Sequence, residues 1–386
     1  MRRHLTDWSL TVLALPLLAL LAYACNGGST GPPNGATPLV VPVPSPFAGI
    51  TSQVVVPDAA IPIAMGFAPD GRLFYAERDT GKVRIVGADG QLVVQPFVQL
   101  GVALGTGWGL LGLALDPDFE TNHFVYLYST RPAGDKLAKP IVVRYTDANN
   151  KGTTPSTIID DFPEATLYGE YFVGGAMRFG PDGYLYIAVG DHVVTSLSQD
   201  LSSVRGKILR VNKEDGSAAP DNPFVNDSDA DPRVFAYGFL DAEYLTFGPA
   251  TGDLFVTEAG TYFCCDEVDR VEGGKNYGWP HHIGLDQKDS PPVHLLAFPG
   301  LPPEGYKVNP AGIEFVSGDV YPALGDSLLV CEAATKYMRR LVLTPNQATA
   351  KSDDVVVADC SLSIVTSPDG TIYYGNDAEI RRLVQS

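Results

Sequence analysis

The sequence predicts an all-β protein, a six-bladed β-propeller whose blades are four-stranded antiparallel sheets. The 386 residues include 40 Gly, 31 Pro, 18 Tyr and 17 Phe, a composition typical of many short strands joined by tight turns. An apolar strand, a Pro-Asp-Gly turn or a relative, and a second apolar strand recur six times. No segment has the period of a long amphipathic helix. A sandwich of two sheets is the alternative fold.

Residues 1–24 have the features of a signal peptide. Arg2 and Arg3 precede an apolar run that ends at Ala22 and is short for a membrane span. A small-x-small cleavage pattern and then Cys25 follow, which resembles a bacterial lipoprotein signal. We therefore expect an exported protein, lipid-anchored to a bacterial membrane through Cys25. Free secretion to the periplasm or the medium is the alternative.

The six repeats fill the expected propeller domain, residues 51–386, after a flexible tether rich in Gly, Pro and Ser over residues 25–50. Glycine supplies the positive φ that such turns need, and the preceding proline presets its own φ. One hairpin is unstable alone, but six at a near-regular spacing can bury one another as blades. The repeats are MGFAPDGRLFYAE (65–77), LALDPDFETNHFVYLYS (113–129), MRFGPDGYLYIAVGD (177–191), LTFGPATGDLFVTE (245–258), IEFVSGDVYPALGDSLLVCE (313–332) and IVTSPDGTIYYGND (364–377).

The repeat also predicts where a ligand pocket lies. If the Pro-Asp-Gly turns share one face of the disc, the starts of the first strands and the ends of the second strands meet at the other face. We expect the residues at these positions to rim a central pocket, a common place for ligands. They are Glu77, Trp108, Tyr171, Phe172, Asp191, His192, Leu240, Asp241, Glu243, Glu258, Glu332 and Asn376.

The charge balance limits the partners of the protein. There are 45 acidic and 27 basic side chains, a formal net charge of −18. Such a chain repels nucleic-acid phosphates and anionic lipid, so we expect no nucleic acid and no membrane contact beyond the lipid anchor. A small molecule, such as a carbohydrate, or an extracellular protein is the expected partner.

Four cysteines follow Cys25 in the chain: Cys264, Cys265, Cys331 and Cys360. An even number in an exported protein predicts two disulfides, and three connectivities are open. Metal ligation or redox chemistry is the weaker alternative, because no Cys/His spacing of a zinc site is present. We also expect at least one disulfide to join loops over the pocket.

Several segments resemble the soluble quinoprotein glucose/sorbosone dehydrogenases, six-bladed propellers that hold pyrroloquinoline quinone (PQQ). The resemblance runs in family order over residues 52–384. Its segments are GLLGLALDPDF, GGAMRFGPDGYLYIAVGD, RGKILRVN, DNPFV and DEVDRVEGGKNYGWP, with the first and last repeats. It implies a PQQ- and calcium-dependent oxidation of aldose sugars.

The residues that the resemblance assigns to the chemistry have mostly changed in this chain. Phe172 stands where the family has its base, a histidine, and Tyr171 stands where an aspartate precedes it. Asp191 is kept. Leu240 and Asp241 replace an Arg-Asn pair that contacts the quinone. Further contact positions hold residues without a positive charge, namely Gly107, Ala259, Ala334, Cys360 and Leu362.

Two metal or catalytic assignments remain. Glu267 and Tyr277 keep the spacing at which the family binds a structural calcium, through a carboxylate and a backbone carbonyl. His192 follows Asp191, and an Asp-His pair can act as a general base. A hydrogen-bonded loop histidine is the alternative for His192.

Three functions are therefore open. The favoured one is a divergent, non-catalytic propeller that binds a ligand or a partner. The second is the PQQ-dependent sugar oxidoreductase that the resemblance implies. The third is a calcium-dependent hydrolase of the lactonase type, with Glu77, Glu258, Glu332 and Asn376 as central ligands.

Overall fold

A computed structural model describes residues 47, 49–134, 137–166, 173–261, 265–286, 290–297 and 307–385. The predicted signal peptide, Cys25 and most of the predicted tether lie outside these residues. So do Tyr171, Phe172 and Cys264.

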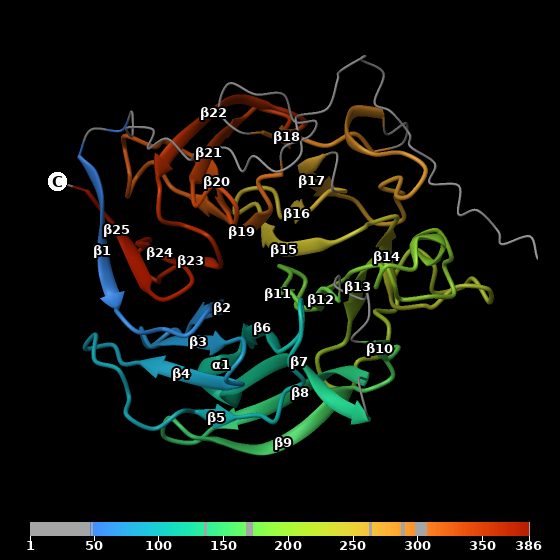
Figure 1. The fold of residues 1–386 in the computed structure, drawn as a ribbon, viewed down its shortest axis with the longest axis horizontal. Coiled ribbons are helices and arrows are strands. Elements are labelled where there is room, and N and C mark those ends of the chain that lie inside the picture. Colours follow the sequence, from blue (N-terminus) through green and yellow to red (C-terminus); the bar gives the residue numbers. More distant parts are fainter. Residues whose placement is uncertain are drawn as a thin grey trace, which may run out of the picture. The chain divides into compact units, whose positions relative to one another are not determined.

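The predicted six-bladed propeller is confirmed: six antiparallel sheets are arranged around a centre (Figure 1). Five sheets have four strands, and the second has a fifth strand that pairs with β8. The first three blades contain β2 (Pro62–Phe67), β3 (Leu73–Glu77), β4 (Lys82–Val86) and β5 (Val98–Gln99); β6 (Leu110–Leu115), β7 (Phe124–Gly134), β8 (Leu137–Asp147), β9 (Gly152–Ile159) and β10 (Ala165–Thr166); and β11 (Met177–Phe179), β12 (Leu185–Val189), β13 (Lys207–Val211) and β14 (Val234–Tyr237).

The other three blades follow in chain order, and the last contains both ends of the domain. They contain β15 (Ala242–Phe247), β16 (Leu254–Glu258), β17 (Asp266–Val271) and β18 (His294–Leu296); β19 (Pro310–Val316), β20 (Ser327–Glu332), β21 (Met338–Leu343) and β22 (Ala350–Val357); and β23 (Ile364–Thr366), β24 (Ile372–Gly375), β25 (Ile380–Gln385) and β1 (Ile50–Val56). Strand β1 pairs with β25 along its length, so the N-terminal strand completes the sixth blade.

The predicted repeats form the first two strands of each blade. In the first blade, β2 pairs with β3 around a turn in which the Gly71 amide donates to the Ala68 carbonyl at 2.9 Å. Gly71 has a φ of +87°, a value that favours glycine. The six first strands contact one another in a closed ring, so they line the centre of the propeller.

The hydrophobic cores lie mainly between neighbouring blades. One cluster, for example, joins Tyr126 and Tyr128 of β7 to Leu185 and Ile187 of β12. A blade that is apolar on both faces needs such neighbours to cover it. The described helices, α1 (Phe119–Asn122), η1 (Thr195–Ser198) and η2 (Gly284–Asp286), are one turn or less each. None of them is long enough to cross a membrane.

Candidate functional site

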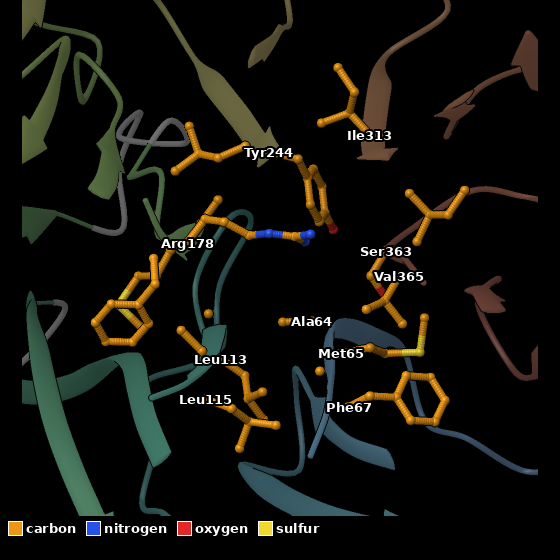
Figure 2. Close-up of a pocket in the computed structure, with 18 of the residues that line it drawn as sticks. Ala64, Met65, Phe67, Leu113, Leu115, Arg178, Tyr244, Ile313, Ser363 and Val365 are labelled. Carbon is orange, nitrogen blue, oxygen red and sulfur yellow. The ribbon is translucent and has the colours of Figure 1, made fainter. Parts of the chain in front are cut away.

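A cavity of about 320 Å³ occupies the centre of the ring of first strands (Figure 2). Its described lining comes from all six first strands and from Pro117 after β6. Tyr244 of the fourth blade is one of the lining residues, and its hydroxyl donates to the Ile63 carbonyl of the first blade at 2.8 Å. None of the predicted rim residues is among its described lining residues. The described lining of the central cavity is therefore made of other residues than the predicted rim.

Several predicted rim residues meet where the third and fourth blades adjoin. The Asp191 amide donates to the Leu240 carbonyl at 2.9 Å. The Leu240 amide donates to Glu258 Oε1 at 2.6 Å. The Ala259 amide donates to the Asp241 carbonyl at 3.1 Å. The fold therefore brings together residues that are up to 68 positions apart in the chain.

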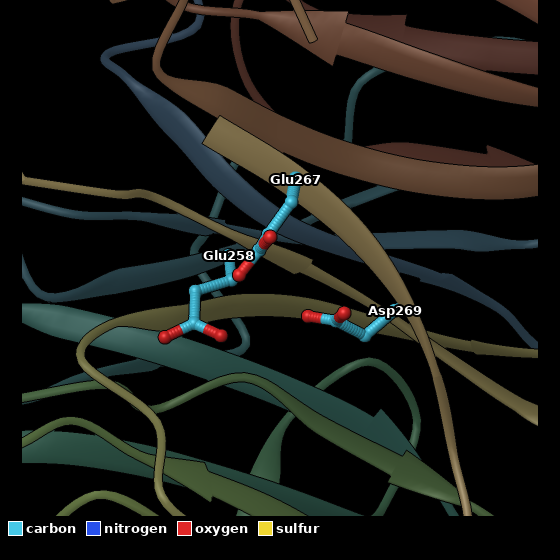
Figure 3. A group of neighbouring side chains, drawn as sticks. All are labelled: Glu258, Glu267 and Asp269. Carbon is cyan, nitrogen blue, oxygen red and sulfur yellow. The ribbon is translucent and has the colours of Figure 1, made fainter. Parts of the chain in front are cut away.

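Three carboxylates converge at this junction: Glu258, Glu267 and Asp269 (Figure 3). Glu258 of β16 pairs directly with Glu267 of β17, and Asp269 lies two residues further along β17. Side chains two apart on a strand share a face, so all three project to the same side of the blade. One oxygen from each lies within 4.8 Å of the others, and each residue is at most 4% exposed.

The burial of these carboxylates disfavours their charged forms. Burial, followed by the neighbouring charge of Asp269, raises the pKa of Glu258 well above its usual value. Burial likewise raises the pKa of Asp269 to about 8. Both Asp269 oxygens and Glu258 Oε2 receive no hydrogen bond from the described residues. A divalent cation among the three side chains would neutralise them, and oxygen ligands of this kind suit calcium.

Asp241 and Glu243 form a second acidic pair near this junction. Asp241 is 6% exposed. Burial, and then the charge of Glu243, raises the pKa of Asp241 well above its usual value. The positive charge of Lys307 acts on both carboxyls and partly offsets this effect. Lys307 itself donates to the Gly260 carbonyl at 2.8 Å.

Asp191 and His192, the predicted Asp-His pair, have different surroundings. Asp191 accepts hydrogen bonds from the Trp279 indole at 2.9 Å and the Val193 amide at 2.6 Å. Burial raises its pKa to about 6. His192 is fully buried, and burial lowers its pKa to about 3. The interactions that act on His192 come from burial, Arg205 and the Val173 backbone, and Asp191 is not among them.

Other predicted site residues lie apart from this junction. Trp108 is 2% exposed and packs with Val173 and three alanines. Glu77 accepts a hydrogen bond from the Thr80 hydroxyl at 2.7 Å. Glu332 contacts Arg339 Nε at 2.8 Å and also bonds the Thr335 hydroxyl.

The four lactonase-type ligands do not form one group among the described residues. The side chain of Asn376 accepts from the amides of Ala378 and Glu379 at 3.0 and 2.8 Å. Glu77 and Glu332 bond within their own blades. The described group of three or more candidate ligands contains only Glu258 of the four.

Tyr277, the second predicted calcium ligand, lies beside the carboxylates. Its ring stacks on Phe239 with centroids 4.6 Å apart, and its hydroxyl donates to the Arg270 carbonyl at 2.8 Å. The negative charge of Asp269 acts on this hydroxyl, which places the two side chains in one region. The backbone at Tyr277 is held by a bond from its amide to the Tyr237 carbonyl at 2.8 Å.

One disulfide joins Cys331 at the end of β20 to Cys360 before β23, so it links the fifth and sixth blades. Both cysteines are fully buried. Cys265 is also disulfide-bonded. Of the three disulfide pairings that the sequence allowed for its four cysteines, only one contains the Cys331–Cys360 bond.

Asp269, Trp279 and Lys307 belong to this site but were not predicted from the sequence. The sequence contained a signal for Asp269. Glu267 and Asp269 are two residues apart on one strand, so they share a face, and Glu258 at the end of the neighbouring strand pairs with Glu267. The sequence contained no such signal for Trp279 and Lys307, because both lie in loops that only the tertiary structure brings to the site.

The fold and this site define a class: six-bladed propellers with buried carboxylates where two blades adjoin. The chain belongs to the glucose/sorbosone dehydrogenase family, whose model matches residues 59–385. An uncharacterized protein of Synechocystis is 27% identical over 96% of this chain and 93% of its own length. The aldose sugar dehydrogenase of Escherichia coli is 28% identical over 72% of this chain and 76% of its own length.

Solved structures agree with this family. An oxidoreductase (glucose dehydrogenase) from Thermus thermophilus has 30% identity and a TM-score of 0.76, covering 87% of this chain and 100% of its own. The PQQ-bound aldose sugar dehydrogenase of Streptomyces coelicolor shares the fold with a TM-score of 0.71 at 24% identity, covering 89% of this chain and 100% of its own. Human Hedgehog-interacting protein is 30% identical over 49% of this chain and 30% of its own length.

Proposed function

We propose that this chain is an exported, divergent member of the family that binds a ligand or partner at the predicted rim without PQQ. The observation that carries this proposal is the Asp241-Glu243 pair. Asp241 stands where the family resemblance places part of a quinone-gripping Arg-Asn pair. A buried carboxyl at this position offers no positive charge to an anion, and an anion beside it would further disfavour its ionised form.

The residues present do not fit PQQ, which carries three carboxylates and needs cations or hydrogen-bond donors. The described contact positions, Leu240, Asp241, Ala259, Ala334, Cys360 and Leu362, provide no cationic side chain. Lys307 is the nearby cation that acts on Asp241, and it already faces Glu243 and Asp266 as well.

Titration with PQQ tests this proposal. We expect the protein with calcium to show no saturable PQQ binding and no sugar-dependent dye reduction, with the Escherichia coli aldose sugar dehydrogenase as positive control. The double variant Leu240→Arg/Asp241→Asn restores a cation and removes a carboxylate, so it should gain measurable PQQ binding. Saturable binding and turnover by the unaltered chain would contradict the proposal.

The chemistry of the rim favours cationic or hydroxyl-rich ligands. Its described acids offer acceptor oxygens to a basic segment of an extracellular protein or to the hydroxyls of a carbohydrate. The likeness to Hedgehog-interacting protein supports a protein partner, and the sugar-acting relatives support a carbohydrate. Binding to immobilised glycans and to basic peptides, compared between the unaltered chain and Asp241→Asn, distinguishes the two classes.

We also propose that Glu258, Glu267 and Asp269 bind calcium, with the Tyr277 carbonyl as a further ligand. Three buried carboxylates with oxygens within 4.8 Å of one another support this, and among them both Asp269 oxygens and Glu258 Oε2 lack described donors. Calcium should raise the melting temperature by several degrees relative to chelator, because it binds only the folded site. Glu267→Gln should abolish most of this shift, and Glu272→Gln, a surface control, should keep it. An unchanged melting temperature with calcium would refute the site.

A further inference from the structure

The central cavity is a second candidate binding site, separate from the rim. At about 320 Å³ it lies at the lower end of the range for small-molecule pockets. That volume corresponds to roughly ten groups the size of a water molecule or a methylene, at about 30 Å³ each. Its walls carry apolar side chains from all six blades, including Leu115, Ile313 and Val365 (Figure 2).

Arg178 is the cationic side chain among the described lining residues, and it extends toward the middle of the cavity (Figure 2). Its Nη2 donates to Glu314 Oε2 at 2.7 Å. Glu314 Oε1 accepts from the Thr246 hydroxyl at 3.1 Å and from the Phe315 amide at 3.2 Å. The carboxylate is therefore held in place, and it holds the guanidinium in turn.

The remaining guanidinium donors are unused. A guanidinium has five N–H donors, and the described residues accept only from Nη2 of Arg178. The side chain is 34% exposed, although the neighbouring Glu314 is only 6% exposed. Arg178 thus presents free donors in a fixed position inside a confined space, which suits recognition of a carbonyl or carboxylate oxygen.

The hydroxyls near the upper end of the cavity are already engaged. Tyr244 donates to the Ile63 carbonyl at 2.8 Å, and Ser363 donates to the Pro62 carbonyl at 2.6 Å. These bonds cross between blades. A ligand that enters from the hairpin face, where Pro117 lies, would find apolar walls and the Arg178 donors.

We propose that the central cavity binds a small molecule with an apolar body of about eight to ten heavy atoms and a carbonyl or carboxylate oxygen. The oxygen accepts hydrogen bonds from Arg178. The apolar body contacts Leu113, Leu115 and Val365, which line the cavity.

Calorimetric titration of the full chain with octanoate and with octanamide tests this site. We expect saturable binding at one site per chain for at least one probe; octanoate alone indicates a carboxylate ligand and octanamide alone a neutral carbonyl. Octan-1-ol, which lacks the carbonyl, should bind at least tenfold more weakly. No saturable binding of either carbonyl probe overturns the proposal.

Two variants locate the binding. Arg178→Met removes the donor and should weaken binding at least tenfold, whereas Arg270→Met, at a surface ion pair with Glu272, should leave it unchanged. If Arg178→Met does not fold because Glu314 loses its partner, Ala64→Leu fills the cavity and should also abolish binding. Unchanged affinity in a folded Arg178→Met or in Ala64→Leu contradicts the assignment. Because PQQ titration reports on the rim, failure at one site leaves the other interpretable.

Discussion

Asp191 shows how burial changes the chemistry of a single residue at this site. In the family resemblance it is the aspartate that follows the third repeat, and here its carboxylate accepts from the Trp279 indole. Burial raises its pKa to about 6, while its two hydrogen bonds and the charge of Arg205 oppose the rise. A carboxyl whose pKa is raised on folding stabilises the folded state. Its full contribution is present at pH values below its pKa in the unfolded chain, which is near 3.8. This stabilisation is lost as the pH rises through 6.

The Trp279 indole should report this titration. Between about pH 4 and 8 its fluorescence should change with an apparent pKa near 6, because the carboxyl that accepts its hydrogen bond becomes charged. Trp279→Phe should remove the transition, while the buried Trp108 keeps a constant signal. An emission that stays flat across this pH range in the unaltered chain would contradict this assignment of the buried carboxyl.

At the scale of elements, a covalent link and polar links join the fifth and sixth blades. The Cys331–Cys360 disulfide links β20 to the segment before β23, with a sequence separation of 29. Nearby, the Gly312 amide donates to the Leu362 carbonyl at 2.9 Å, which also joins the fifth and sixth blades. This blade pair is therefore fixed more strongly than hydrophobic packing alone would fix it.

Replacing both cysteines, Cys331→Ser with Cys360→Ser, should lower the free energy of unfolding by about 3–4 kcal/mol, because the cross-link restricts a loop of this length in the unfolded chain. Urea unfolding at neutral pH measures the change. Cys25→Ser, which lies outside the propeller, serves as the matched control and should leave the midpoint where it is. An equal midpoint for the double variant would show that the cross-link contributes little.

At the scale of the whole molecule, the ring is closed by strands from its two ends. Strand β1 pairs with β25 from Ile50 opposite Gln385 to Val56 opposite Ile380. Ile50 and Val56 are 6% and 4% exposed. Without β1 the sixth blade would lose its outer strand and expose the edge of β25.

A chain that begins at Asp58 should therefore be much less stable than one that begins at Phe47. Loss of two buried side chains and a row of strand hydrogen bonds should cost at least about 4 kcal/mol. Thermal unfolding monitored by circular dichroism compares the two chains. Coincident melting curves would mean that β1 does not close the ring.

The recurrent hairpins predicted the blades well, since Pro-Asp-Gly between apolar strands specifies a turn locally. The outer strands were harder to foresee: β5 and β10 have two residues each, and β9 adds a fifth strand to the second blade. At the site, Glu258 and Asp241 were found as strand-end residues. The closeness of Glu258 to Glu267 and Asp269 depends on strand register, which the repeat alone does not specify.

The amino-acid sequence by itself determined the number of blades, the direction of their hairpins and the acidic character of the rim, because these follow from local turns and composition. Only the tertiary structure decided which acids meet, which cysteines pair and where a cavity remains. Those outcomes depend on packing between segments far apart in the chain. Arg178 illustrates the difference: it sits in an ordinary strand, and only the closed ring places its free donors in the central cavity.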